Sequence, residues 1–326
     1  MSIKIGMVGT GGFSTMHAHK LMEIEDVSIA AICGTSKQKA DSMAEEFKGA
    51  KGFDQINDML DQVELDAVYI CTPPMAHGPV ELALIERGIP FFVEKPLGVD
   101  AKIPSEIMDK IKEKSLVTSV GYHFRYRESV QQLKQLLTTH KLGMVTGEWM
   151  GSMPGVYWWK KQELSGGQFN EQTTHIVDIL RFVAGEVDEV YAYFGNRVMA
   201  ENDSEVTVAD VGSVTMKMVS GVVATISNTC ILPDSTGRVG LTCYTDKNIA
   251  DWRVDQLEIT RGQERTMHHD ALDPYLEESK AFIHAITTGD RSRILSDYED
   301  AFLTQQVTRA AYESAISGLP VKLVTT

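Results

Sequence analysis

One stretch near the N-terminus decides the fold: Ile3-Lys4-Ile5-Gly6-Met7-Val8-Gly9-Thr10-Gly11-Gly12-Phe13-Ser14. Its apolar first half predicts a buried strand, and the pattern that follows Ser14 predicts a helix. Gly9 suits the tight turn, Gly11 allows close approach of a pyrophosphate, and Ser14 stands where a third small residue packs the helix on the strand. The positive end of the helix dipole favours phosphate. We therefore expect a dinucleotide to bind Gly9, Gly11, Gly12, Phe13 and Ser14; the alternative is a plain strand-to-helix turn.

The first 122 residues alternate strand patterns with helical patterns. The strand patterns are continuously apolar, as in strands that are buried on both faces of a parallel sheet. The alternation predicts a doubly wound α/β domain over residues 1–122. Strands are expected at Ile3–Val8, Val27–Cys33, Asp66–Cys71, Pro90–Glu94 and Leu116–Gly121, and helices at Ser14–Ile24, Lys37–Phe47, Gly78–Arg87 and Pro104–Lys114.

The pattern changes after Tyr122. Alternating strand patterns joined by Ser220-Gly221 predict a hairpin. Residues 123–326 are therefore expected to form an α+β domain with a large, mostly antiparallel open sheet. Strands are expected at Val206–Val219, Val222–Ile231, Arg238–Tyr244 and Gln256–Thr260, and helices at Ser129–Thr139, Phe169–Val183, Pro274–Thr287 and Asp297–Ser317.

Composition excludes several classes of protein. The chain has 326 residues, 43% of them apolar and 23% charged, which is typical of a globular protein rather than a disordered one. The apolar runs are far shorter than a membrane span of about 20 residues. The net charge of −14, without a basic cluster, argues against a nucleic-acid partner. The four cysteines lack metal-binding spacing and are expected to be buried thiols. No secretory leader pattern opens the chain, so we expect a cytoplasmic protein.

The residues after the second strand bear on the form of the cofactor. Many NAD sites place a carboxylate there, on the adenosine ribose. Here the segment is Gly34-Thr35-Ser36-Lys37, and its hydroxyls and lysine suit a 2′-phosphate. The segment slightly favours NADP(H) over NAD(H). In the alternative, Thr35 and Ser36 only cap the next helix and NAD binds without a carboxylate.

Two further loops follow strands of the predicted parallel sheet. The first contains Thr72-Pro73-Pro74 and His77, and the second contains Glu94-Lys95-Pro96. Ligands of open α/β sheets bind at the carboxyl ends of the strands. We therefore expect Thr72, Pro73, Pro74, His77, Glu94 and Lys95 to border the cofactor. The ammonium of Lys95 can hold a substrate hydroxyl and stabilise developing alkoxide.

Together, these motifs make the chain resemble the glucose-fructose oxidoreductase, inositol dehydrogenase and MocA family of NAD(P)-dependent oxidoreductases. The other residues that carry the resemblance are Gly121–Arg127, Ser165–Gln168 and the Glu171-x-x-x-His175-x-x-Asp178 pattern. The resemblance implies hydride transfer between nicotinamide and a hydroxyl or carbonyl carbon of a sugar, cyclitol or derivative. It implies a catalytic set of Lys95, His175 and Glu171, although aspartate is commoner at position 171. It also leaves open an NAD-dependent glycoside hydrolase and a cofactor-sensing regulator without catalysis.

The spacing of the second motif agrees with that assignment. Glu171, His175 and Asp178 fall on one face of a single predicted helix. Histidine titrates near neutrality and can take the hydroxyl proton. Glu171 would then orient His175 or bind a neighbouring hydroxyl. The alternative is a core histidine bonded within its own helix, with Asp178 as a solvated charge.

Several other residues are candidates for substrate binding. They are Tyr122, Arg125, Trp158 and Tyr275, beside Lys95, Glu171 and His175. In the alternative interpretation, Arg125 forms an interdomain salt bridge and Trp158 only packs against its neighbours. His17-x-His19 and His268-His269 lack the further ligands of a metal site, so no metal is expected. A homodimer or homotetramer through the second domain's sheet is expected, because an open sheet face needs cover.

Overall fold

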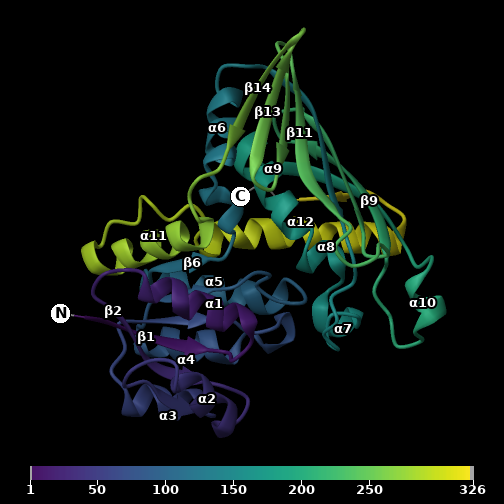
Figure 1. Cartoon of the computed structure of the whole chain (residues 1–326). Coiled ribbons are helices and arrows are strands. Elements are labelled where there is room, and N and C mark those ends of the chain that lie inside the picture. The colour runs from purple at the N-terminus through teal and green to yellow at the C-terminus, as the bar shows by residue number, and fades with distance from the viewer. Residues whose placement is uncertain (1, 324–326) are drawn as a thin grey trace. The chain divides into compact units, whose positions relative to one another are not determined.

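The computed structural model describes residues 2–323, which divide into two compact units (Figure 1). The first unit comprises residues 2–98, Lys102–His123 and Asp273–Phe302. The second comprises Val99–Ala101, Phe124–Leu272 and residues 303–323. A late segment, 273–302, therefore belongs with the N-terminal part of the chain rather than with the residues that precede it.

The first unit contains a six-stranded parallel sheet in the order β3-β2-β1-β4-β5-β6. The chain moves outward in one direction from β1 and then in the other from β4, so the order reverses between these neighbours. Such a reversal opens a crevice at the carboxyl ends of the strands, where α/β proteins bind ligands. The strands are β1 (Ile3–Val8), β2 (Val27–Cys33), β3 (Lys51–Phe53), β4 (Ala67–Ile70), β5 (Phe91–Val93) and β6 (Thr118–Val120).

Helices pack on this sheet, and α11 joins them from late in the chain. Phe282 and Ile283 of α11 lie in the same apolar core as Ile5 and Leu21. The short strand β3 and helix α3 escaped the sequence interpretation, because three and seven residues give too little periodicity. The helices are α1 (Gly12–Met22), α2 (Lys37–Ala44), α3 (Ile56–Gln62), α4 (Pro79–Arg87), α5 (Lys102–Lys114) and α11 (Pro274–Thr288), with 3-10 turns η1 (Pro74–Ala76) and η2 (His123–Tyr126).

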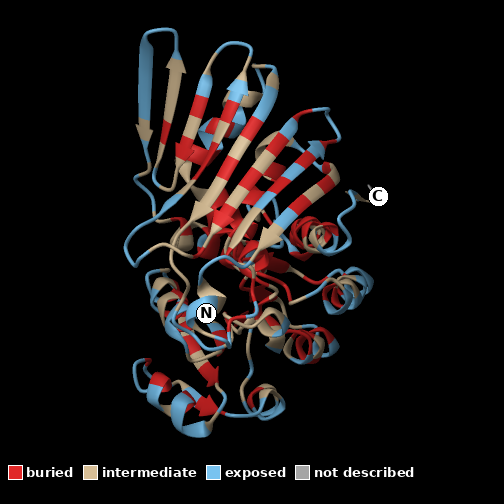
Figure 2. Cartoon of the chain, turned by 90° about the vertical axis from the view of Figure 1, so that its right-hand side faces the viewer, coloured by how far each residue is buried: buried red, intermediate tan, exposed pale blue. Residues whose placement is uncertain are grey.

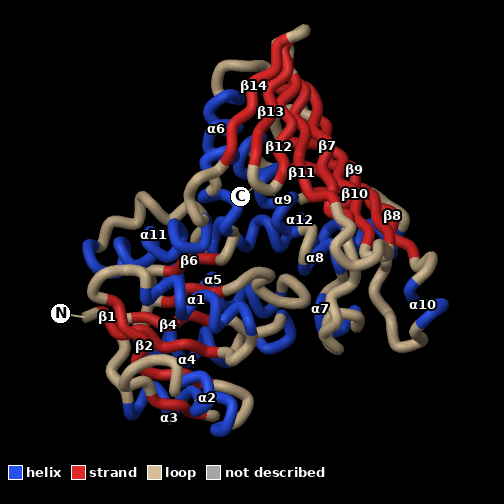
Figure 3. The backbone as a smooth tube through the Cα atoms, viewed as in Figure 1, coloured by secondary structure: helices blue, strands red, loops and turns tan. Residues whose placement is uncertain are grey.

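The second unit contains a nine-stranded sheet in the order β14-β13-β12-β11-β7-β10-β9-β8-β15 (Figure 3). Only β7 and β10 pair in parallel. The predicted hairpin at Ser220-Gly221 is confirmed, since β9 and β10 pair antiparallel around it. The strands are β7 (Leu142–Met150), β8 (Val187–Gly195), β9 (Val211–Met218), β10 (Val223–Thr229), β11 (Arg238–Thr245), β12 (Ile249–Arg253), β13 (Gln256–Arg261), β14 (Glu264–His269) and β15 (Val321–Lys322).

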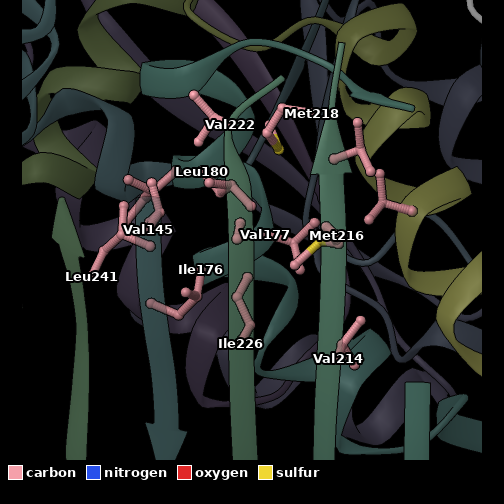
Figure 4. Close-up of a cluster of buried hydrophobic side chains, with 14 of the residues drawn as sticks. Val145, Ile176, Val177, Leu180, Val214, Met216, Met218, Val222, Ile226 and Leu241 are labelled. Carbon is pink, nitrogen blue, oxygen red and sulfur yellow. The ribbon is translucent and has the colours of Figure 1, made fainter. Parts of the chain in front are cut away.

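One face of this sheet packs on helices, and buried and less buried residues alternate along its strands (Figure 2). Helix α9 contacts β7 and β11, and α6 contacts β12. Ile176 and Val177 of α9 interdigitate with Val145, Val214 and other strand residues in the core (Figure 4). The helices are α6 (Glu128–Leu137), α7 (Gln162–Ser165), α8 (Gln168–Glu171), α9 (Thr174–Ala184), α10 (Met199–Asn202) and α12 (Tyr298–Ser317), whose first residues lie in the first unit.

Two predicted elements of this unit differ from the structure. The single helix expected over 169–183 is two, α8 and α9, because Thr173 N bonds Gln168 O across five residues and interrupts the regular ladder. The strand expected from Val206 begins only at Val211. Asp210 lies just before this strand, and its carboxylate accepts hydrogen bonds from the backbone N–H groups of residues 197–199. These bonds hold Asp210 in a loop instead of in the strand.

Candidate active-site residues of the two units

The glycine turn of the first unit is built as the sequence predicts. Gly9 has φ of +115°, and a Cβ there would lie 2.3 Å from the carbonyl oxygen of Cys71, so only glycine fits this turn. No side chain caps the N-terminus of α1, and a Cβ at Gly11 or Gly12 would meet no atom within 4 Å. Phe13 is exposed, and Ser14 donates to Gly9 O. The uncapped helix end and the space beside it fit a pyrophosphate.

Backbone hydrogen bonds connect the loops that leave neighbouring strands of this sheet. Gly9 N donates to Cys33 O at 2.8 Å, and Cys71 N donates to Val8 O at 2.8 Å. In the same way, Glu94 N donates to Ile70 O at 2.8 Å. The glycine turn, the Thr72–His77 loop and Glu94-Lys95 therefore share the carboxyl edge of β1, β4 and β5, where the sequence analysis expects them.

The residues after β2 favour neither cofactor form decisively. Ser36 Oγ accepts from Lys39 N and so caps α2, as the alternative interpretation holds. The ammonium of Lys37 pairs with Asp41 one helical turn on, in an exposed ion pair of the kind that contributes little to stability. Thr35 is exposed. No carboxylate occupies positions 34–37, so the segment remains compatible with a 2′-phosphate.

The loop after β4 offers a hydroxyl and a histidine. Thr72 Oγ1 is buried and has no hydrogen-bond partner among residues 2–323, so it suits a bound polar group. His77 is also buried, and its Nδ1 lies 2.6 Å from Glu81 Oε1. Burial opposes ionisation of Glu81, but the charge of His77 and hydrogen bonds from His77 and Gly78 N lower the pKa of that carboxyl. His77 thus bonds within the protein through one nitrogen.

Lys95 follows β5 and is partly exposed. Its backbone N–H donates to the carboxylate of its neighbour Glu94 at 3.2 Å, and Glu94 is itself buried. The backbone that carries Lys95 is therefore held from inside the first unit, while the side chain starts from the carboxyl edge of the sheet.

His175 lies in the first turn of α9 in the second unit and is 5% exposed. Its ring stacks on Trp149 of β7, with centroids 5.8 Å apart, and contacts Phe124 at 5.1 Å. Two aromatic rings from separate elements therefore fix the plane of the imidazole. Such restraint is what a group needs if it is to move a proton at a defined place.

Glu171 ends α8 and is bound by a residue that the sequence analysis missed. Trp159 Nε1 donates to Glu171 Oε2 at 2.7 Å, and Trp159 is 1% exposed. The sequence analysis named the neighbouring Trp158 as a substrate-binding candidate, and that stays a prediction. Trp158 is partly buried and packs against the cluster of Trp159, Val206, Val208 and Cys230. The adjacent pair of tryptophans was a signal, but spacing alone does not tell which of the two faces Glu171.

Asp178 and Arg125 form a buried ion pair within the second unit. The Nε and Nη2 atoms of Arg125 lie 2.8 and 2.6 Å from the two oxygens of Asp178. Asp178 is therefore not a solvated charge. Of the two interpretations of Arg125, the salt bridge is the one the structure contains, although it joins α9 to η2 inside one unit rather than two domains.

Comparisons with known proteins agree with these features. The family model described as "Oxidoreductase family, NAD-binding Rossmann fold" (GFO/IDH/MocA) matches residues 3–122, and that of the GFO/IDH/MocA C-terminal domain matches 130–247. The chain belongs to this family. The myo-inositol 2-dehydrogenase of Thermotoga maritima is 24% identical over 98% of both chains. The D-glucoside 3-dehydrogenase of Escherichia coli is 23% identical over 98% of this chain and 97% of its own.

Solved structures show the same fold. The WlbA dehydrogenase from Bordetella pertussis, crystallised in complex with NADH and UDP-GlcNAcA, superimposes with a TM-score of 0.87 at 21% identity over 100% of both chains. The present chain, as a member of the GFO/IDH/MocA family, is an oxidoreductase with an NAD-binding Rossmann fold. The two relatives given above are named as dehydrogenases of a cyclitol and of a glucoside.

The remaining predicted residues of this family member have varied settings. Tyr122 is 1% exposed, in the first unit. Tyr275 opens α11, and its ring stacks on His123 with centroids 4.1 Å apart.

Three of the cysteines are buried thiols, as expected, and burial raises the pKa of Cys230 and Cys243 to about 12. No helix among the described residues is long and apolar enough to cross a membrane.

Of the four histidines that the sequence analysis considered for a metal, only His17 belongs to a group of potential metal ligands among the described residues. His19 is exposed and pairs with Glu46, whereas His17 is buried. Within residues 2–323 one group of three potential ligands does lie together, namely His17, Glu94 and Glu278. The sequence analysis did not anticipate it, because Glu278 stands more than 180 residues after Glu94.

Proposed function

We propose that the chain interconverts a hydroxyl and a carbonyl on a sugar, cyclitol or sugar derivative, with NAD(P) as the hydride carrier. The observation that carries this proposal is the conjunction, in the first unit, of an uncapped glycine turn and Lys95 on one sheet edge. The whole-length similarity to a myo-inositol 2-dehydrogenase and a D-glucoside 3-dehydrogenase supports the substrate class.

The proposal divides the work at residue 122. Residues 1–122 hold the cofactor, and residues 123–326 hold the substrate and the assembly surface. When bound, the nicotinamide supplies or accepts the hydride. Gly9 makes the tight turn beside the pyrophosphate, Gly11, Gly12, Phe13 and Ser14 bind it through backbone N–H groups, and Thr72 Oγ1 offers a further polar contact.

Three residues carry the proton chemistry in this proposal. Lys95 donates a hydrogen bond to the reacting oxygen and stabilises its negative charge. His175 takes the hydroxyl proton in oxidation and returns it in reduction. Glu171, held by Trp159, accepts a hydrogen bond from a neighbouring substrate hydroxyl. The family pattern assigns all three to one reaction.

The proposed cofactor preference slightly favours NADP(H). Its support is the absence of a carboxylate at residues 34–37 and the presence of Lys37, whose exposed pairing with Asp41 is readily exchanged for a phosphate. Comparison of kcat/KM for NAD and NADP tests this preference. A large advantage for NAD would contradict it and would assign Ser36 to capping alone.

A row of apolar side chains supports assembly through the second unit's sheet. Ile249, Tyr244, Met144 and Val223 pair in register across β12, β11, β7 and β10, and each is 38–46% exposed. A contiguous apolar row on an otherwise uncovered sheet face is typical of an interface. We propose a homodimer or homotetramer that buries this row. A solution mass of one 36.1 kDa chain would contradict it.

A panel of polyols, sugars and glycosides tests the function. Reduction of NAD(P) is followed by absorbance, and products are analysed for a new carbonyl group. We expect stoichiometric cofactor reduction with at least one cyclitol or sugar. Release of a glycoside's leaving group without net cofactor reduction would indicate the hydrolase instead. Cofactor binding without turnover of any of these compounds would favour the regulator.

A further inference from the structure

Three polar groups meet inside the first unit without contact with solvent. His17 comes from α1, Glu94 follows β5, and Glu278 comes from α11; they are 0%, 7% and 0% exposed. One side-chain atom of each lies within 4.8 Å of those of the other two. Buried charges are rare unless they are paired, so this cluster needs an explanation.

Glu94 has the partners of an ionised carboxylate. His17 Nε2 lies 2.7 Å from its Oε1, within hydrogen-bond distance, and Lys95 N donates to its Oε2 at 3.2 Å. A Cβ on Gly121 would lie 2.7 Å from Oε1, so a glycine is needed where the chain passes this carboxylate. Glu94 is therefore the carboxylate of the cluster to which the protein supplies hydrogen-bonding partners.

Glu278 has the opposite setting. Neither of its oxygens has a hydrogen-bond partner among the described residues, and the side chain is fully buried. Burial, together with the charges of Glu94 and Asp273, raises the pKa of this carboxyl well above its ordinary value. A neutral Glu278 has a hydroxyl to donate, while Nδ1 of His17 is buried and has no partner either.

We propose that His17, Glu94 and Glu278 form a positioning cluster in which Glu278 holds a proton and ionised Glu94 fixes the backbone of Lys95 against α1. The cluster ties together three segments: the helix whose N-terminus faces the pyrophosphate, the loop that carries Lys95, and α11. It sets Lys95 relative to the cofactor turn without touching the substrate. Its catalytic meaning rests on the proposed function, whereas the position of the proton does not.

Other titratable groups border the cluster and belong in any account of its pH dependence. Asp273 of α11 pairs with Lys20 of α1 at 3.0 Å, so these two charges offset each other. Burial and the charge of Glu94 raise the pKa of the Cys71 thiol well above its ordinary value, although a hydrogen bond with Ser14 opposes them. The rings of Tyr69, Phe92 and Tyr275 surround His17, with centroids 5.2–5.9 Å away.

The first experiment locates the proton through stability. The folded chain keeps the Glu278 proton above about pH 4.5, where the unfolded chain releases it. Its contribution to stability is therefore full below that pH and is lost as the pH rises through the folded pKa. We expect the ratio of the unfolding constants of wild type and Glu278→Gln to change by up to about tenfold per pH unit in that window.

Glu277→Gln is the matched control, because Glu277 is the adjacent, partly exposed carboxylate of α11. The ratio of the unfolding constants of wild type and Glu277→Gln should stay constant above about pH 6. A constant ratio for Glu278→Gln would overturn the proposal. If Glu278→Gln does not fold, the carbon-13 shift of the Glu278 carboxyl in the wild-type chain reports the same proton, and a carboxylate at pH 7 would overturn it.

The second experiment measures hydrogen–deuterium exchange of the peptide that carries residues 91–98. Glu94→Gln removes the charge from the bond to Lys95 N, so we expect roughly tenfold faster exchange there and a lower kcat. Glu81→Gln, a buried carboxylate elsewhere in the unit, is the control and should leave this peptide unaffected.

Exchange at residues 91–98 that does not respond to Glu94→Gln would contradict the cluster's role. A separate measurement of metal content could contradict it too. If the wild-type chain retained one equivalent of divalent metal through dialysis and Glu278→Gln lost it, these residues would be metal ligands. If the wild-type chain oxidises no sugar or cyclitol, the proposed function fails, while exchange and stability still decide the cluster.

Discussion

Each unit of the molecule buries a polar cluster, and the two clusters differ in how completely their charges are paired. In the second unit, Asp178 accepts both bonds of Arg125 and a third from Thr304. Thr304 in turn accepts from Arg181, which binds Glu186 through two nitrogens. In the first unit, Glu278 faces Glu94 and has no partner of its own among the described residues.

The comparison separates two uses of buried polarity. A network in which every charge is matched holds elements together and resists change. A network with one charge too many must hold a proton, so it is responsive to pH and can be coupled to a reacting group beside it. The Arg125 cluster is of the first kind, and the cluster of His17, Glu94 and Glu278 next to Lys95 is of the second.

The largest expected effect is on the matched network. Asp178→Ala leaves the Arg125 guanidinium buried without its counterion and should destabilise the chain by about 3–5 kcal/mol, measured by urea unfolding. Asp203→Ala removes an exposed partner of Lys160 and should change the free energy of unfolding far less. If the two variants were equally stable, the Arg125 pair would not be the structural bond we describe.

The next effect compares the reacting groups of the two units. Lys95→Ala and His175→Ala should each lower kcat by at least about a hundredfold, because each removes a general acid–base or electrostatic contribution. Binding of NAD(P)H, followed by fluorescence titration, should survive in both variants, since neither is part of the glycine turn. Near-normal turnover in either variant would remove that residue from the catalytic set.

The smallest effect concerns the support of Glu171. Trp159→Phe keeps the aromatic packing but removes the Nε1 donor, so Glu171 loses one charge-assisted bond. We expect kcat/KM for the substrate to fall by roughly tenfold, with stability close to that of the wild type. Trp158→Phe is made in parallel, because Trp158 remains a predicted substrate-binding residue. An unchanged kcat/KM in Trp159→Phe would contradict the support of Glu171 by Trp159.

Local signals predicted much of the first unit. The run 3–8 and the run 27–33 are strands with those bounds, and Gly88 ends α4 in a left-handed conformation. These features depend on residues that are adjacent in the chain, and periodicity reports them directly. The second unit was harder, because several of its strands are interrupted by glycine or lie exposed at the sheet edge, as Gly147 in β7 and the polar β14 illustrate.

The candidate site divides in the same way. The motifs around Gly9, Lys95 and His175 are contiguous in sequence and were predicted from it, and the family comparisons agree with the activity that they imply. Several contacts around these motifs were not predicted. Trp159 was not named as the partner of Glu171, Arg125 was left undecided between two roles, and Glu278 was not considered.

The sequence by itself determined the doubly wound domain, the dinucleotide turn and the membership of an oxidoreductase family, because each is a short-range pattern of residue types. Only the tertiary structure decided that residues 273–302 join the first unit and that Asp178 neutralises Arg125. It alone decided that Glu278 meets Glu94. These outcomes depend on which side chains, distant in sequence, are buried together. The free-energy cost of an unpaired buried charge then determines whether each group is paired or protonated, and no local sequence pattern reports that cost.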